Sequence, residues 1–547
     1  MARPLAFGAA IAVALLAVSG AGGVSAQTPK RGGTLVIGTR PASEPACLNA
    51  FACELGVTFG SFLGEVLPGA FEVMPDATFR PDLIVGADIV SRSPFTVVYR
   101  IRPEARWSDG VRVSAADFAF TDRVRRTQLP DDLHRTYVRS VRPLDAKTVR
   151  VVLRAPFADW RYLFDVVLPR HALVGEDFPS VWAGEIDNPK TGRAIGSGPF
   201  LFGRWERGKQ LTFVRNPRYW GPHPAYLDRI VYRFLPVEDI EPGLRRGEIE
   251  MIDPAPAILG ASAAEFHRRP APGIRVLSAL SASYEHFTIR MGEGGHPALR
   301  GRQGKIVRQA LAFGIDRVEI ARTIGRLSGA GIAALQPADS AVYLPSSPYY
   351  RPNWKGYRYQ PDRARRLLEQ AGCRRGADRV YVCAGERLSL RFVAPAGIER
   401  RELTVRLAQA QLRQVGVEVR PVFAPPQTAF GQILPSGDFD LILFGWIVGA
   451  STSWDDVFGC QRPSNFMRYC DRLVTRDLVQ ATRIIVDSRR AGLLNGIDAR
   501  LAKAVPIIPL YQVSGFFAFK ATLRGVVPNG PGSWAWNSED WWLAQSR

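Results

Sequence analysis

The chain has 547 residues, which is too long for one ordinary hydrophobic core and corresponds to about three or four domains of ~150 residues. Its 46% hydrophobic, 22% charged and 10% aromatic residues are typical of a folded globular protein and exclude a disordered polyelectrolyte or a collagen-like fibre. The net charge of +20 first suggests a nucleic-acid partner, but the basic residues, most of them arginine, are scattered along the whole chain, so we expect none.

The first 26 residues have the pattern of a secretory signal peptide. Arg3 precedes an apolar run from Leu5 to Val18, and small residues lead to a cleavage site after Ala26. The alternative, a transmembrane anchor, needs ~20 apolar residues, and this run is shorter. The first cysteine is Cys47, so the sequence predicts no lipid attachment at the cleavage point. We therefore expect a periplasmic or extracellular protein.

Short apolar and β-branched runs between turn residues predict strands along the mature chain. These predicted strands cover residues 31–38, 96–101, 149–153, 211–215, 230–235, 417–422 and 439–446. The last of them ends on Gly445 and Trp446 and passes them into a loop.

Helix signals lie between these strands and become denser after about residue 300. Ser114 with Asp117 predicts a capping box, and Asp316 with Glu319 predicts a second one. Further helices are predicted over residues 306–311, with an interruption at Gly314, and over 361–372 and 399–415, the last two ending at glycines. A helix followed directly by a strand is the repeating unit of an α/β fold.

The six cysteines fall into three close pairs: Cys47 with Cys53, Cys373 with Cys383, and Cys460 with Cys470. In an exported protein, an even number of locally paired cysteines predicts disulfides. Zinc binding is the competing interpretation, but no spacing is the short C-x-x-C type and no histidine lies beside a pair. Free buried thiols are the other alternative.

Catalytic and cofactor motifs are missing from the sequence. It contains no G-x-S-x-G, H-E-x-x-H, G-x-x-x-x-G-K-[ST] or G-x-G-x-x-G pattern, and its six histidines are far apart. A catalytic triad assembled in space is still compatible with this absence. We expect a binding protein rather than an enzyme, with no cofactor and no metal.

Several segments resemble the periplasmic solute-binding proteins of ABC importers, family 5, the dipeptide/oligopeptide-binding family. They recur in family order over nearly the whole mature chain: Gly32-Gly-Thr-Leu-Val-Ile-Gly38, Tyr99-Arg-Ile-Arg-Pro103, Trp107-Ser-Asp-Gly110, Gly196-Ser-Gly-Pro-Phe200, Arg215-Asn-Pro-Arg-Tyr-Trp220, Arg246-Gly-Glu-Ile-Glu250, Val307-Arg-Gln-Ala-Leu311, Ala364-Arg-Arg-Leu-Leu368, and Phe439-Asp440 with Gly445-Trp446. Each segment alone is weakly specific, but together and in register they are strongly so.

The resemblance implies an α/β, bilobed periplasmic-binding-protein-like fold of type II, in the large class with an additional domain. Residues 27–65, 196–292 and 505–547 are then a discontinuous lobe I, residues 66–195 the additional domain and residues 293–504 lobe II. Crossing strands serve as hinges, and closure over a solute excludes water from it.

The resemblance also suggests where a solute binds. Peptide-binding members hold the α-ammonium with a carboxylate three residues after the Trp of the Gly-Trp pair, and that position here is Gly449. Asp455 or Asp456 is a possible substitute from a shifted loop; otherwise the solute lacks a free α-amino group. Besides Gly445, Trp446 and Asp455, the predicted ligand-binding residues are Trp454, Glu44, Asn49, Tyr284 and Arg290. The alternatives are tryptophans in the core, Asp455-Asp456 as a helix cap, Glu44 as a solvated charge and Arg290 in an interlobe salt bridge.

We therefore expect a monomeric receptor that captures a peptide or peptide-like solute and delivers it to ABC permease subunits. A non-peptide solute, such as an opine, a sugar derivative, a lipid headgroup or a metal chelate, is the main alternative because of Gly449. A regulatory envelope protein without transport and a secreted hydrolase are the others.

Overall fold

The computed structural model describes residues 28–49, 51–53, 56–129, 133–190, 192–254, 269, 271–327, 336–448 and 454–544. The predicted signal peptide and Gly449 lie outside these described residues.

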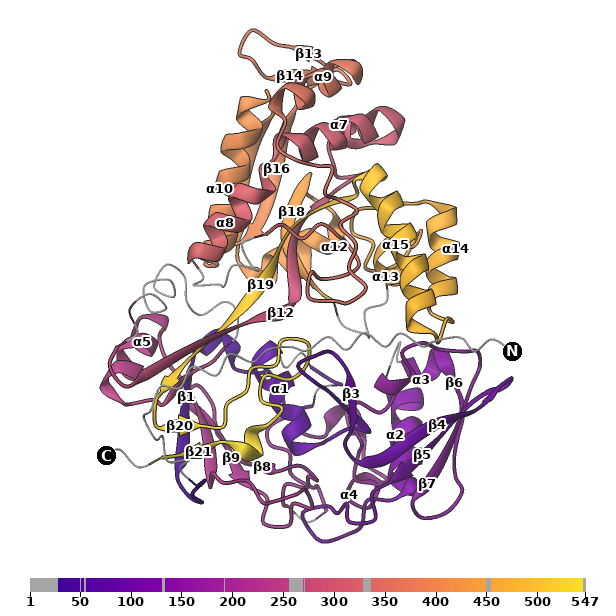
Figure 1. The fold of residues 1–547 in the computed structure, drawn as a ribbon, viewed down its shortest axis with the longest axis vertical. Helices are drawn as coiled ribbons and strands as arrows, with labels where there is room; N and C mark the ends of the chain where they lie inside the picture. Colours follow the sequence, from indigo (N-terminus) through magenta and orange to yellow (C-terminus); the bar gives the residue numbers. More distant parts are fainter. Residues whose placement is uncertain are drawn as a thin grey trace, which may run out of the picture.

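The chain forms two halves joined by two long strands, β12 (Ile274–Ile289) and β19 (Ile507–Lys520), as Figure 1 shows. We call the described residues of 28–273 and 521–544 the lower half, and those of 290–506 the upper half. Each half has its own large hydrophobic core: one is built mainly from residues 35–251, and the other runs from Tyr284 to Tyr511. Two separate cores explain why the halves form distinct bodies, since each buries its own apolar surface.

One mixed sheet of ten strands passes through both halves. Its order is β17 (Glu418–Ala424), β16 (Ser389–Pro395), β18 (Leu441–Ile447), β12, β19, β11 (Met251–Ile252), β1 (Thr34–Thr39), β10 (Arg229–Phe234), β9 (Gln210–Arg215) and β8 (Phe200–Glu206). β12 pairs antiparallel with β19 over nearly its whole length, and its register shifts between Leu280 and Tyr284. That irregularity lies where the paired strands pass from one half to the other.

The lower half adds a separate four-stranded antiparallel sheet and five helices. The sheet order is β4 (Ile84–Arg92), β5 (Phe95–Ile101), β7 (Thr148–Leu153) and β6 (Val138–Pro143). The helices are α1 (Gly56–Val66), α2 (Ala115–Gln128), α3 (Leu133–Tyr137), α4 (Arg170–Leu173) and α5 (Val237–Arg246). Two short pairs complete it: β2 (Phe71–Val73) with β3 (Phe79–Pro81), and β20 (Leu523–Arg524) with β21 (Trp542–Leu543). A Cβ on Gly198 would lie 2.1 Å from the carbonyl oxygen of Glu65 at the end of α1, which explains the glycine in the Gly-Ser-Gly turn.

The upper half is an α/β unit in which α8 and α10 lie on one side of the strands, and α14 and α15 on the other (Figure 1). Its helices are α7 (Gly301–Gly314), α8 (Arg317–Leu327), α9 (Pro361–Gln370), α10 (Glu399–Gln414), α11 (Pro426–Thr428), α12 (Leu434–Ser436), α13 (Trp454–Phe458), α14 (Arg472–Ala481) and α15 (Asp487–Ala504). A small sheet of β13 (Arg374–Arg375), β14 (Tyr381–Cys383) and β15 (Glu386–Arg387) lies at its far end.

One of the two predicted capping boxes forms completely. Ser114 and Asp117 make the reciprocal bonds at the start of α2. The prediction for Asp316 and Glu319 is wrong in one half: the Asp316 carboxylate accepts from the Glu319 N–H at 2.9 Å, but the Glu319 carboxylate accepts from Gln411 instead. The backbone N–H of Asp316 donates to the same Gln411 side chain, so a residue of α10 replaces the local partner.

All three predicted cysteine pairs are disulfide-bonded, with S–S distances of 1.99 Å for Cys47–Cys53, 2.04 Å for Cys373–Cys383 and 2.10 Å for Cys460–Cys470. Each bond closes a loop of 6 to 10 residues.

Within the described residues no helix has the length and apolar character needed to cross a membrane.

Candidate functional site

The Gly445-Trp446 pair lies on β18, directly beside β12 at the junction of the halves. In the antiparallel register, Trp446 is opposite Tyr284 and Gly445 is opposite Glu285. The Trp446 indole stacks on the ring of His286, with centroids 5.7 Å apart and an interplanar angle of 15°. Trp446 is half-buried, and its indole N–H has no hydrogen-bond partner among the described residues.

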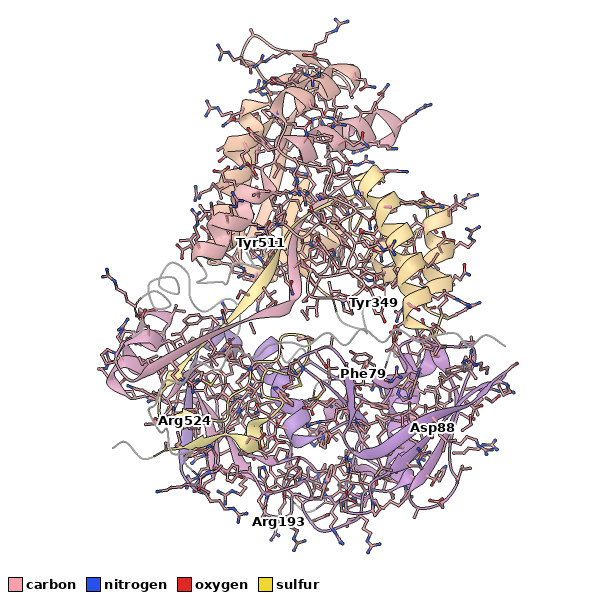
Figure 2. All side chains as sticks on the ribbon, in the orientation of Figure 1. Phe79, Asp88, Arg193, Tyr349, Tyr511 and Arg524 are labelled. Carbon is pink, nitrogen blue, oxygen red and sulfur yellow. A yellow bond between two sulfur atoms is a disulfide. The ribbon has the colours of Figure 1, made fainter. Side chains whose placement is uncertain are left out.

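Next to this pair, a buried carboxylate is held by two arginines. Glu285 is completely buried, and its Oε1 accepts from Arg400 Nη2 at 2.7 Å and from Arg401 Nε at 3.0 Å. Burial by itself would raise the pKa of Glu285, but the charges and hydrogen bonds of Arg401 and Arg400 outweigh it and hold that pKa below its ordinary value. Both arginines lie on α10, and so does Thr404. The hydroxyl of Tyr511, which is labelled in Figure 2, lies 3.1 Å from Thr404 Oγ1. The carboxylate is therefore ionised and fixes both guanidinium groups.

Tyr284 and Arg290 are also on β12 or directly after it, but their polar atoms bind the upper half itself. The Tyr284 hydroxyl donates to the Ala341 carbonyl at 2.9 Å, and the side chain is 1% exposed. Arg290 donates to the backbone carbonyls of Glu293 at 2.7 Å and Phe466 at 2.8 Å. These contacts give both residues a structural role, and contact with a solute stays a prediction for each.

Trp454 and Asp455 begin α13 and lie against residues of the lower half. Asp455 pairs with Arg462 at 2.8 Å, and burial raises its pKa. With Tyr137 and Asp159 they line a cavity of about 30 Å³, which is room for a single water molecule. In this conformation Trp454 and Asp455 thus belong to a contact between the halves, and their role toward a solute remains a prediction.

That contact contains an ion pair between distant parts of the chain. Arg490 of α15 donates to both carboxylate oxygens of Asp159, at 2.6 and 3.0 Å, and the two side chains are only 16% and 9% exposed. Beside the pair, the backbone N–H of Ala158 donates to the Thr482 carbonyl at 2.8 Å. The lower and upper halves are therefore joined here as well as through β12 and β19.

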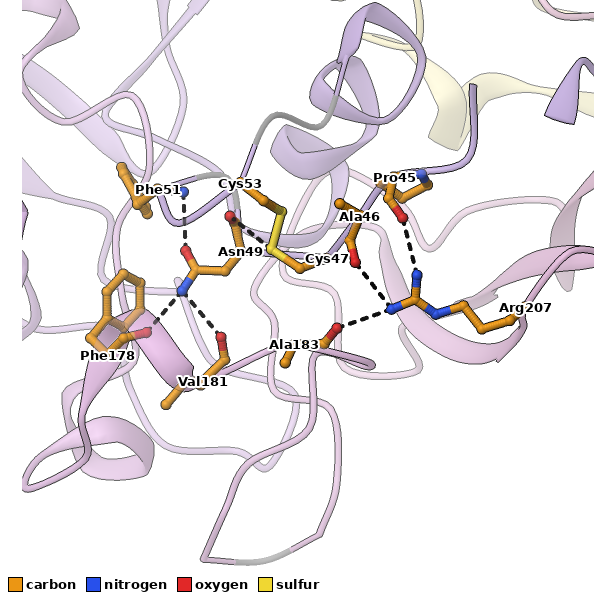
Figure 3. Close-up of a disulfide and its surroundings, with 10 residues drawn as sticks. All are labelled: Pro45, Ala46, Cys47, Asn49, Phe51, Cys53, Phe178, Val181, Ala183 and Arg207. Carbon is orange, nitrogen blue, oxygen red and sulfur yellow. Dashed lines mark hydrogen bonds between the residues drawn. A yellow bond between two sulfur atoms is a disulfide. The ribbon is translucent and has the colours of Figure 1, made fainter. Parts of the chain in front are cut away.

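Asn49 and Glu44 lie in the loops after β1, in the lower half. Figure 3 shows Asn49 beside the Cys47–Cys53 disulfide, with its Nδ2 donating to the carbonyls of Phe178 at 2.9 Å and Val181 at 3.1 Å. Asn49 is fully buried, so it fixes this loop to the lower half. The Glu44 carboxylate accepts from the Trp205 indole N–H at 2.9 Å and from the Gly208 N–H at 3.0 Å, which ties the loop to the β8–β9 hairpin. Ligand contact by either residue stays a prediction.

Sequence reasoning missed Glu285, Arg400 and Arg401, as well as the pair of Asp159 and Arg490. Glu285 gave one usable signal, since it is the one carboxylate of the strand Ile274–Ile289. The arginines gave none, because consecutive charges at the start of a helix usually face solvent. The described residues contain no group of three or more His, Cys, Asp or Glu side chains suited to a metal ion.

The sequence matches the family of bacterial extracellular solute-binding proteins, family 5, over residues 78–465. The chain belongs to this family. Among curated proteins, it is 27% identical to the oligopeptide-binding protein OppA of Mycobacterium tuberculosis over 86% of this chain and 78% of that protein.

Solved structures of other binding proteins share its fold. The periplasmic EDTA-binding protein EppA superposes with a TM-score of 0.83 at 22% identity, over 95% of this chain and 98% of that one. The oligopeptide-binding protein AppA of Bacillus subtilis, in complex with a nonapeptide, superposes with a TM-score of 0.77 at 21% identity, over 95% and 100% of the two chains. The predicted bilobed α/β fold is thus confirmed.

Proposed function

We propose that this protein binds a solute between its lower and upper halves and delivers it to the permease subunits of an ABC importer. The observation that carries the proposal is the pair of separate cores joined by β12 and β19, with Gly445 and Trp446 at the junction. Two bodies on a two-stranded connection can rotate toward each other at small cost until a solute stabilises the closed form.

Family membership supports an exported receptor rather than an enzyme. The predicted signal peptide, with cleavage after Ala26, accords with this location. We retain the predicted division into a discontinuous lobe I, an additional domain over residues 66–195 and a lobe II over 293–504, and we expect the protein to act as a monomer.

A peptide is one candidate solute, because relatives named as oligopeptide-binding proteins cover most of this chain. A non-peptide solute is the second candidate, and two observations favour it. The sequence has Gly449 where the resemblance predicts an ammonium-binding carboxylate, and EppA is named as an EDTA-binding protein.

The test combines native mass spectrometry with small-angle X-ray scattering. The purified protein is expected to retain a small molecule that is released on denaturation, and to become more compact when that molecule is added back to the emptied protein. A protein that retains no solute and keeps the same radius of gyration with every peptide and anion tested would refute the proposal.

A further inference from the structure

A cavity of about 210 Å³ lies between the two halves, on the side of the four-stranded sheet. Figure 1 shows its place, where the lower ends of α14 and α15 approach that sheet. The lower half contributes Ile89, Arg92, Phe95 and Pro156, and the upper half contributes Arg483, Ile484, Ile485, Val486 and Arg489. None of the predicted ligand-binding residues belongs to this described lining, so the cavity is distinct from the junction beside Trp446.

The walls of this cavity depend on contact between the halves. The upper-half residues come from the loop between α14 and α15 and from the first turn of α15. From that loop, Ile485 packs against the hydrophobic core of the lower half, and so does Ile89 of β4. Directly after Arg489, Arg490 forms the ion pair with Asp159 that joins the halves. The cavity is therefore complete only in the form in which the halves meet.

Most of the lining is apolar, since six of its nine residues are Ile, Val, Phe or Pro. Phe95 is buried, whereas Val486 is 47% exposed, so the lining extends from the protein core to the solvent. An apolar cavity of ~150 Å³ holds a benzene molecule. The larger volume here has room for a ring or a short chain of that size and for a few further atoms.

The three other lining residues, Arg92, Arg483 and Arg489, are all cationic, and the described lining contains no carboxylate. Asp487 is the neighbouring carboxylate in the chain, and it is not part of the lining. All three arginines are exposed, and none has an ion-pair or hydrogen-bond partner for its guanidinium among the residues that the structure describes. Like charges around one cavity repel one another, and an anion placed among them removes that cost.

We propose that this cavity binds a small carboxylate with an apolar body, such as hexanoate or benzoate, and that its binding favours the form in which the halves meet. The apolar body is covered by the apolar walls, and the carboxylate meets the arginines, whose paired N–H groups match its two oxygens. A ligand that binds one of two forms shifts the population toward that form. The binding itself is independent of the proposed function, whereas the effect on the halves rests on it.

The test is isothermal titration calorimetry on the protein emptied of solute, with matched probes. Hexanoate and benzoate are compared with hexanamide and benzamide, which lack the charge, and with acetate, which lacks the apolar body. We expect at least one of the two acids to bind, and to bind at least about tenfold more tightly than its amide and than acetate.

Variants place the binding in this cavity. Arg483→Gln with Arg489→Gln is expected to weaken binding of the acid at least about tenfold and to leave the weak binding of the amide unchanged. Val486→Trp fills part of the cavity and is expected to weaken the acid and the amide alike. The matched control is Arg500→Gln, which changes an exposed arginine about three turns further along α15 and is expected to leave every affinity unchanged.

The binding site is overturned if neither acid binds up to millimolar concentration, if acid and amide bind equally, or if both the double arginine variant and Val486→Trp leave the affinity for the acid unchanged. Small-angle X-ray scattering tests the effect on the halves. Saturating hexanoate is expected to reduce the radius of gyration of the emptied protein, and an unchanged radius with the acid bound overturns that effect. Failure of the proposed function has a different signature, because a protein that retains no solute still binds hexanoate in this cavity.

Discussion

The ion pair of Asp159 and Arg490 is expected to stabilise the closed form, and Arg490→Gln tests this. The two residues come from opposite halves, so opening separates them. Truncating one partner of a fully buried pair costs about 3 to 5 kcal/mol, because the other charge is left uncompensated. Since the side chains are 16% and 9% exposed, water screens part of the charge, and we expect the loss of Arg490 to cost the closed form about 2 kcal/mol.

A cost of about 2 kcal/mol in the closed form alone corresponds to a roughly 30-fold weaker solute affinity. Calorimetric titration with the copurifying solute measures this change, and X-ray scattering of the emptied Arg490→Gln protein is expected to give a larger radius of gyration. The control is Arg500→Gln, a change at an exposed residue of the same helix, which is expected to leave both quantities unchanged.

The double variant Asp159→Asn with Arg490→Gln separates charge from packing. It leaves no uncompensated carboxylate, so its affinity is expected to lie between those of Arg490→Gln and the unmodified protein. The reasoning is refuted if Arg490→Gln changes the affinity less than twofold, because the pair would then contribute equally to the open and closed forms.

Three further predictions concern stability. Cys373→Ala with Cys383→Ala opens a 10-residue loop and is expected to cost about 2 to 3 kcal/mol of unfolding free energy in denaturant titration; an unchanged midpoint contradicts the loop-entropy argument. Burial raises the pKa of both Asp82 and Glu539 to about 7, so the folded protein binds more protons than the unfolded chain between about pH 4 and 7. Their contribution to stability is therefore present in acid and is lost as the pH rises through about 7; urea midpoints at pH 5 and 8 measure this, and Asp82→Asn is expected to reduce the difference. Tyr284→Phe leaves a buried carbonyl without its donor and is expected to cost about 1 to 3 kcal/mol without changing solute affinity, whereas a weaker affinity at unchanged stability would indicate ligand contact.

Local features of this protein follow from the sequence because their causes are local. The strands at β1, β5, β7, β9 and β10 and the helices from α7 to α10 have alternation, caps and terminal glycines within a few residues of one another. The three disulfides join cysteines only 6 to 10 residues apart, so near neighbours in the chain become neighbours in space. The segments that resemble the solute-binding family also predicted the bilobed fold.

The partners of buried charges were decided only by the tertiary structure. Glu285 meets Arg400 across 115 residues, and Asp159 meets Arg490 across 331 residues. The start of α8 is a second example. The backbone N–H of Asp316 donates to Gln411 of α10 rather than to Glu319, the partner that the local sequence predicts. The sequence shows which residues are charged and which are apolar. Which opposite charge a buried group contacts depends on how the fold brings distant elements such as β12, α10 and α15 into place. A buried charge needs such a partner, because leaving it unpaired costs several kcal/mol.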